Sequence, residues 1–220
     1  MKIMRSWRGT IAVALLLGTT VLGATQSFAD DDDDSENRNV PEFTRVVIEG
    51  AMDMIITAGE DQSVRVETDR GYMSRVETRV SGETLYVSQE GRWRDGNLFL
   101  EISVETIEGL GIEGAGDVEI YNIDTDSFEM NIDGAGDVTL EGRCVDADYE
   151  INGAGDLDAE AFECENVEIR INGAGDAEVY ASESVVAVLN GVGDIEVCGD
   201  PRSVKPRIFG LGSFEVRDDC

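Results

Sequence analysis

Acidic side chains recur at a fixed place beside a short glycine motif, and their spacing could support chemistry. The motif Gly-x-Gly-Asp begins at glycines 114, 134, 153, 173 and 191, and an altered copy with serine in place of aspartate begins at Gly210. A second acidic residue usually follows two positions after the aspartate. The residues of these two columns are Asp117, Glu119, Asp137, Asp156, Asp158, Asp176, Glu178, Asp194 and Glu196.

Two interpretations of these carboxylates remain open. Stacked oxygen ligands suit Ca²⁺, which would also relieve the repulsion between neighbouring carboxylates. Alternatively, each aspartate accepts hydrogen bonds from backbone amides of its own glycine turn. The first interpretation predicts a ladder of calcium ligands, and the second predicts a structural cap without any cofactor.

The rest of the composition argues against catalysis. The chain contains no histidine, so serine hydrolase triads, Cys–His pairs and the common zinc hydrolase sites are excluded. The glycine motifs lack the third glycine and the helix of a dinucleotide site. A glycosidase needs only two carboxylates, and a chain with 47 acidic residues meets that condition trivially. We therefore expect a protein that is not an enzyme, with a carbohydrate-active enzyme as the alternative.

Apolar residues recur in step with the glycine motif and define the fold. The successive motifs lie 20, 19, 20, 18 and 19 residues apart, which indicates a solenoid repeat of about 19 residues. Three columns of apolar residues alternate with polar ones on both sides of the turn, and period two is typical of strands. The columns are Ile112, Ile132, Ile151, Ile171, Leu189 and Ile208, then Val118, Val138, Leu157, Ala177, Ile195 and Phe214, then Ile120, Leu140, Ala159, Val179, Val197 and Val216.

These columns predict an all-β, parallel β-helix with coils of about 19 residues over residues 110–220. An up-and-down antiparallel meander is the alternative. Residues 42–109 are less regular and are expected to form the first coils and an N-terminal β cap, with Gly50-Ala-Met-Asp53 as a decayed copy of the turn. The strands expected there are 45–48, 54–57, 64–68, 76–80, 85–88 and 98–104.

Four cysteines, an even number, suggest disulfides in an exported chain. Cys144 and Cys164 each lie nine residues before a motif glycine, so equal register on adjacent coils places them within disulfide reach. Cys198 and Cys220 then pair by elimination. The alternative is buried free thiols.

The N-terminus predicts export. Three basic residues precede an apolar stretch from Ile11 to Leu22, and Ser27-Phe28-Ala29 offers a cleavage site, so residues 1–29 are predicted to be a signal peptide. No other apolar run is long enough to span a membrane. Residues 30–41 begin with five aspartates and are expected to form an acidic disordered tether. The formal net charge of −30 disfavours nucleic acids and anionic lipids as partners.

The motif copies resemble a known bacterial family. Ile-Asn-Gly-Ala-Gly-Asp at 151–156 and at 171–176, its close copy at 132–137 and the early turn at Gly50 are similar to the putative auto-transporter adhesin, head GIN domain. The resemblance covers roughly residues 43–217. It implies a right-handed parallel β-helix and an exported, non-enzymatic protein with a surface or adhesive role.

Together these observations favour an exported β-helix module for adhesion or cell-envelope interaction, located in the periplasm or at the cell surface. The partner is expected to be an envelope protein or a glycan. The alternatives to this module are a carbohydrate-active enzyme and a calcium-binding scaffold.

Overall fold

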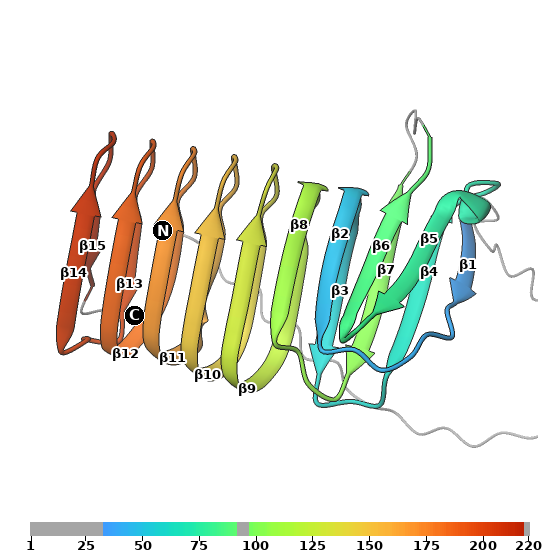
Figure 1. Ribbon diagram of the computed structural model, residues 1–220, viewed down its shortest axis with the longest axis horizontal. Coiled ribbons are helices and arrows are strands. Elements are labelled where there is room, and N and C mark those ends of the chain that lie inside the picture. The colour runs from blue at the N-terminus through green and yellow to red at the C-terminus, as the bar shows by residue number, and fades with distance from the viewer. Residues whose placement is uncertain (1–32, 92–96, 218–220) are drawn as a thin grey trace, which may run out of the picture. The chain divides into compact units, whose positions relative to one another are not determined.

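Alternating apolar and polar residues form strands almost throughout the described part of the chain (Figure 1). The computed structural model describes residues 33–91 and 97–217. It contains one short 3₁₀ helix, η1 (Met73–Arg75), and no α-helix within those residues. The strands are β1 (Asp33–Asn37), β2 (Arg45–Ala51), β3 (Asp53–Ala58), β4 (Ser63–Asp69), β5 (Val76–Ser81), β6 (Thr84–Gln89), β7 (Leu98–Val104), β8 (Gly109–Ala115), β9 (Val118–Ile132), β10 (Val138–Ile151), β11 (Leu157–Ile171), β12 (Ala177–Leu189), β13 (Ile195–Cys198), β14 (Ser203–Ile208) and β15 (Phe214–Val216).

The strands join a large, mostly parallel sheet of β-helix-like organisation that folds into two layers. The first layer runs in the order β1, β4, β7, β3, the first parts of β9 to β12, β13 and β15. The second layer runs β5, β6, β2, β8, the second parts of β9 to β12, and β14. We call one strand of each layer, joined in sequence, a rung. The alternative of an antiparallel meander is wrong for the regular repeats, where every pairing is parallel.

The glycine motif forms the turn that joins the second-layer strand of a rung to the first-layer strand of the same rung, as between β8 and β9. The middle residues of the turns pair in a continuous column from Ala115 to Leu211. Both glycines are required by close backbone approach, because a Cβ on Gly153 or Gly155 would collide with the carbonyl oxygen of the equivalent glycine on the preceding rung. The turn therefore sets how closely the rungs stack.

The early turn predicted at Gly50 is confirmed. Gly50 and Ala51 align with Gly114 and Ala115 in the parallel register of β2 and β8. The amide of Met52 donates to the Ala115 carbonyl at 3.1 Å, as in the regular turns. The six strands predicted between residues 45 and 104 are also present as β2 to β7.

The order of the first rungs differs from their order in the chain. The rung of β2 and β3 lies between the rung of β6 and β7 and the rung of β8 and β9. From β1 at the edge of the first layer, the chain enters the stack at β2 and β3, builds the N-terminal cap with β4 and β5, adds β6 and β7, and returns to the other side of β2 and β3. Antiparallel pairing occurs in this cap, where β4 joins β1 and β7 and β5 joins β6.

The expected disordered tether over residues 30–41 is wrong for Asp33–Asn37, which forms β1. This strand pairs antiparallel with β4 over its whole length. Main-chain hydrogen bonds and an ion pair between Arg38 and Glu36, at 3.2 Å, stabilise the acidic strand at the edge of the sheet. Local charge repulsion was therefore a poor guide, because the partners of this segment lie far away in the sequence.

The three apolar columns form the core between the layers. All their members up to Val197 are at most 2% exposed, as the alternation predicted. The members of the last rung differ, because Ile208 is 43% exposed and Phe214 and Val216 are only partly buried. No further strand pairs with β14 or β15 within the described residues, so their core-facing side chains are uncovered.

Candidate functional site: the polar ladders and the hollow over β8

The turn aspartates point outward and link one rung to the next. Asp137 accepts a hydrogen bond from the amide of Asp156 at 3.1 Å, and Asp156 accepts one from Asp176 at 2.8 Å. Asp176 and Asp194 continue the ladder towards Ser213, whose amide and hydroxyl both donate to Asp194 Oδ1 at 2.7 Å. These two donors lower the pKa of Asp194, the hydroxyl having the larger effect.

The donor of each hydrogen bond differs from the one expected. The sequence interpretation placed the amide in the same glycine turn, whereas the structure places it on the equivalent residue one rung further along. The same contact begins the ladder in the cap, where Asp53 accepts from the amide of Asp117 at 3.1 Å. The aspartates therefore fix the register between rungs.

A second ladder of amide side chains runs beside the aspartates and was not identified from the sequence. Asn172 donates to Asn152 and Asn190 donates to Asn172, each at 2.8 Å, and Asn152 donates to Asp133 at 3.0 Å. The signal was present in the sequence, since each of these residues directly precedes a motif glycine. The ladder ends at Phe209, which occupies the same place in the last rung.

The outer acidic column lies on the surface of the first layer, as strand parity predicted. Glu119, Asp158, Glu178 and Glu196 alternate with buried residues. Tyr121 donates its hydroxyl to Glu119 at 2.7 Å, and this hydrogen bond raises the pKa of Tyr121.

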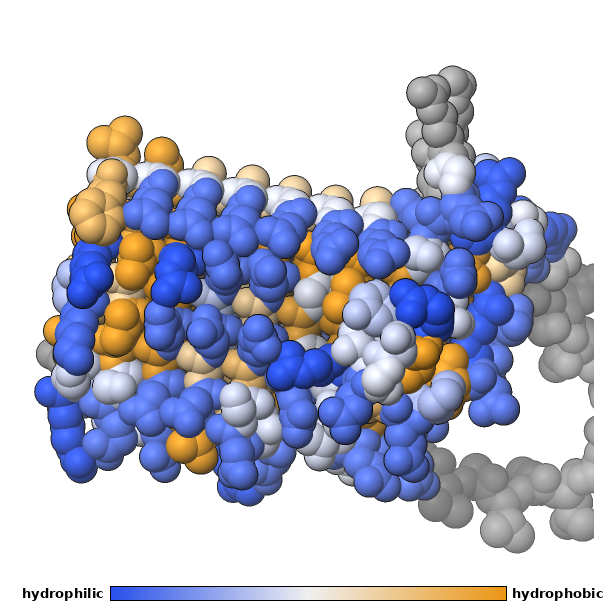
Figure 2. Space-filling view, in the orientation of Figure 1, coloured by the Kyte–Doolittle hydropathy of each residue, from blue (hydrophilic) through white to orange (hydrophobic). Residues whose placement is uncertain are grey.

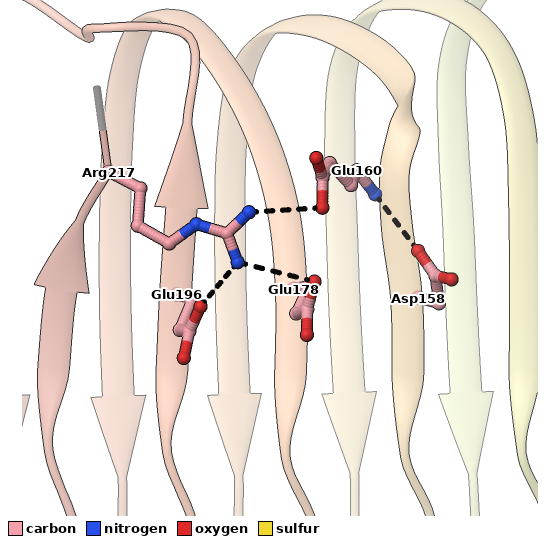
Figure 3. Close-up of polar contacts among 5 residues, drawn as sticks. All are labelled: Asp158, Glu160, Glu178, Glu196 and Arg217. Atoms are coloured by element: carbon pink, nitrogen blue, oxygen red, sulfur yellow. Dashed lines mark hydrogen bonds and ion pairs between the residues drawn. The ribbon is translucent and has the colours of Figure 1, made fainter. Parts of the chain in front are cut away.

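The column contacts a basic side chain that sequence reasoning missed. Arg217 lies 2.6 Å from Glu196, 3.6 Å from Glu178 and 3.3 Å from Glu160 (Figure 3). Burial and the neighbouring Glu160 raise the pKa of Glu178, while the hydrogen bond to Glu196 raises the pKa of Arg217. The protein therefore supplies its own cation at this end of the column, from a residue distant in sequence.

The predicted calcium ligands do not converge. Within residues 33–91 and 97–217, no three acidic or cysteine side chains are grouped so that they could hold a metal ion. The turn aspartates that were expected as ligands instead accept amide hydrogen bonds from Asp137 to Asp194. Calcium binding by the two columns stays a prediction.

The cysteine prediction is confirmed for Cys144 and Cys164, which form a disulfide with Cα atoms 4.5 Å apart. They face each other in the parallel register of β10 and β11. Cys198 is buried and also disulfide-bonded. Its predicted partner, Cys220, lies outside the described residues, as does the predicted signal peptide.

A hollow of about 200 Å³ opens on the outer face of the second layer, over β8. Two outward positions of β8 are glycines, Gly109 and Gly111, so β8 itself places no side chains there, and Arg45 and Val47 of β2 lie over the two glycines. Arg45 and Glu129 form an ion pair of 2.7 Å within its lining. The aromatic and polar side chains around it are Tyr86, Glu113, Glu129, Asn131 and Asp133.

One acceptor in this hollow has no partner in the fold. Asn131 Oδ1 is shielded from solvent and receives no hydrogen bond from the described residues, while the amide nitrogen donates to Asp133 at 3.4 Å. Tyr86 lies across the hollow, and Arg79 stacks on its ring at 4.6 Å. An aromatic ring and carboxylates around a shallow hollow are groups that can contact the hydroxyls and ring of a sugar.

Comparison with known proteins gives a consistent family. A family model described as "Putative auto-transporter adhesin, head GIN domain" matches residues 42–201. A putative adhesin from Bacteroides fragilis is 23% identical, with a TM-score of 0.68, over 85% of this chain and 98% of that chain. A putative adhesin from Parabacteroides distasonis is 19% identical, with a TM-score of 0.45, over 86% of this chain and 98% of that chain. Among the curated proteins, none matches this chain. No helix of the described residues is long and apolar enough to cross a membrane.

Proposed function

Because this chain belongs to the putative auto-transporter adhesin, head GIN domain family, we propose that it is an exported, non-enzymatic adhesion module that binds glycans of the cell envelope. The observation that carries the proposal is the hollow over β8, which is lined by Tyr86, Asn131 and the carboxylates of Glu113 and Asp133. The family name and the putative adhesin with which the fold is shared support an adhesive role. The absence of histidine from the sequence supports binding without turnover.

The proposal includes the path of the chain and its compartment. The rungs wind as a right-handed parallel β-helix, the hand preferred when parallel strands are connected in one direction. Residues 1–29 direct export and are removed. The stack then serves as a rigid support on which the hollow and the polar ladders are held by rung-to-rung hydrogen bonds.

The direct test is binding of the purified chain to immobilised bacterial and host glycans, followed by calorimetry with the oligosaccharides that bind. Asn131→Leu and Tyr86→Ala should each abolish or strongly weaken binding while leaving the melting temperature nearly unchanged. Asn166→Leu is the matched control, because Asn166 lies on the same layer but outside the hollow. Recovery of the bound oligosaccharide uncleaved would support a binding module, whereas shortened products would establish the alternative of a carbohydrate-active enzyme.

Calcium binding is a second candidate, supported by the two acidic columns. Calorimetric titration with Ca²⁺, together with thermal melts in chelator and in millimolar Ca²⁺, tests it. Heat of binding and a raised melting temperature that Asp158→Asn and Glu178→Gln remove would support a role for the outer column. Equal melting temperatures in both conditions would leave the turn aspartates with their structural role alone.

A further inference from the structure

The C-terminal edge of the stack carries an exposed apolar patch that the glycan hollow does not explain. We define the C-terminal edge as β14, β15 and the turn of residues 209–213 between them. Phe209 and Leu211 are 75% and 74% exposed, and Val192 on the preceding turn is 55% exposed. Val204 and Ile208 of β14 add exposed apolar surface beside them. Figure 2 shows hydrophobic residues gathered at this corner, whereas the outer turns of the preceding rungs are small or hydrophilic.

The patch arises because the last rung departs from the repeat at three alternate positions of its turn. The amide ladder that ends at Asn190 is replaced by Phe209, the small turn residue by Leu211, and the turn aspartate by Ser213. Phe209 and Ser213 replace the Asn and Asp side chains that link neighbouring rungs. Leu211 is larger than the alanines that stack at this position in the earlier turns. Large apolar side chains placed on an exposed turn indicate an interaction surface.

Growth of the sheet by strand addition is disfavoured at this edge. Phe209 donates its amide to Leu189 on β12, and backbone groups alternate in direction along a strand. Pro206 therefore occupies a position whose N–H would face the free edge, and proline has none. The exposed Lys205 and Arg207 on either side also discourage edge pairing. A contact here must be made mainly by side-chain packing.

The charge of the edge suggests which surface covers it. Residues 201–217 carry four basic side chains and one acidic one, in a chain with a net charge of −30. Arg202 pairs with Glu183, and Arg217 pairs with the outer acidic column. Two copies of this chain repel each other at most approaches. Their C-terminal edges are the surfaces at which that repulsion is weakest, and the apolar patches are the same on both copies.

We propose that the C-terminal edge is a self-association surface, at which two copies join end to end about a twofold axis through the patch formed by Val192, Val204, Ile208, Phe209 and Leu211. The contact is isologous, so it closes as a dimer and does not propagate into a filament. Salt strengthens the association by screening the acidic bodies. The contact leaves the glycan hollow over β8 outside the interface, so it is independent of the proposed function.

Sedimentation velocity of the purified chain at about 5 to 500 µM, in low and moderate salt, tests the proposal. A monomer–dimer equilibrium that tightens with salt is expected. Phe209→Asn with Leu211→Ala restores the residues that the rung of Asn172 and Ala174 carries at these positions, so this variant should fold, which circular dichroism and thermal melts will check. It should dimerise at least about tenfold more weakly than the parent chain. Val145→Ala, which changes an exposed apolar residue elsewhere, should have no effect.

A mixing experiment tests the symmetry of the contact. A chain with Lys205→Glu and Arg207→Glu should form mixed dimers with the parent chain in preference to either homodimer, because opposite charges then meet across the axis. A lack of preference would overturn the end-to-end arrangement. A monomer at every concentration, species whose size keeps rising, or a monomer that floats with phosphatidylcholine vesicles would overturn the proposal.

Discussion

The two ends of the stack are built from the same kind of strand but are finished differently. At the N-terminal end, the antiparallel strands β4 and β5 flank the rung of β6 and β7, and β1 flanks β4. Val64, Val66 and Val76 are at most 5% exposed there. Arg38 reaches across that end from the first layer and donates to the carbonyls of Met73 at 3.3 Å and Val76 at 3.5 Å. At the C-terminal end, Ile208 continues a fully buried column and is nevertheless 43% exposed.

This contrast shows that the apolar pattern specifies which way a side chain faces but not whether anything covers it. The parity of Ile208 is the same as that of Ile171, which is fully buried. Burial requires a neighbour on both sides of the rung, and among the described residues a further strand lies in that place at the N-terminal end but not beside β14 or β15. The contribution of an apolar column residue to the free energy of unfolding should therefore depend on the rung in which it lies.

The largest effect should come from removing matched core residues near the two ends. Ile102→Ala, near the closed end, removes a side chain that is 1% exposed and should lower the free energy of unfolding by about 3 kcal/mol. Ile208→Ala should lower it by less than about 1 kcal/mol, because much of that side chain already contacts water. Urea denaturation at low protein concentration, where association is minimal, measures both. Equal losses would contradict the difference between the ends.

Removal of the disulfide should allow local unfolding of the C-terminal end to extend into the neighbouring rungs. Replacing Cys144 and Cys164 by alanine removes a cross-link between residues 20 apart and should cost about 3 kcal/mol in the chain-entropy model. Hydrogen exchange should show fast exchange in β13 to β15 of the parent chain, and in the variant this should extend to β11 and β12. Strands β4 and β7 serve as the internal control, since they lie at the closed end.

The closing side chain at the N-terminal end should have a moderate effect. Arg38→Met keeps most of the apolar stem but loses the two carbonyl contacts and the exposed ion pair with Glu36, and it should lower the free energy of unfolding by about 1–2 kcal/mol. Arg202→Met at the open end removes only an exposed ion pair and should change stability little. If the two variants unfolded at the same denaturant concentration, the contacts of Arg38 would not stabilise the N-terminal end.

The smallest effect should be a difference in pH dependence along the open end. The lowered pKa of Asp194 means that its carboxylate contributes stability above the ordinary pKa of an aspartate, and this contribution is lost as pH falls through the lowered pKa. The raised pKa of Glu178 gives the opposite sign, since its contribution is present below the ordinary pKa of a glutamate and is lost as pH rises through the raised pKa. Asp194→Asn should therefore melt slightly below the parent chain at neutral pH, and the difference in melting temperature should shrink as pH falls through the lowered pKa of Asp194. A difference in melting temperature that grew as pH fell would contradict this prediction.

The regular repeats were predictable because each rung carries its own signal. Ile132 and Ile151 show the alternation, the motif glycines mark each turn, and equal spacing from those glycines identified the Cys144–Cys164 disulfide. Exposure of the two acidic columns followed from strand parity. The spacing of Asn152 and Asn172 carried the same signal for a ladder, but their position directly before the motif glycines is equally typical of turn residues.

The remaining features depend on contacts between segments far apart in the sequence. Alternation alone could not place β2 between β6 and β8, because parallel register is set by which rung docks on which. Nor could it indicate that Arg217 contacts Glu178 and Glu196, or that Gly109 and Gly111 lie where a hollow opens beside Asn131.

The sequence by itself therefore determined the length of the repeat, the strand faces, the turn chemistry and one disulfide, because these depend on residues within one rung or at equal positions in neighbouring rungs. Only the tertiary structure decided the order of the first rungs, the strand formed by the acidic segment, the rung-to-rung donors of the aspartates and the unequal ends of the stack. These depend on which segment lies beside a given rung, and a single column of apolar residues carries no information about its neighbour.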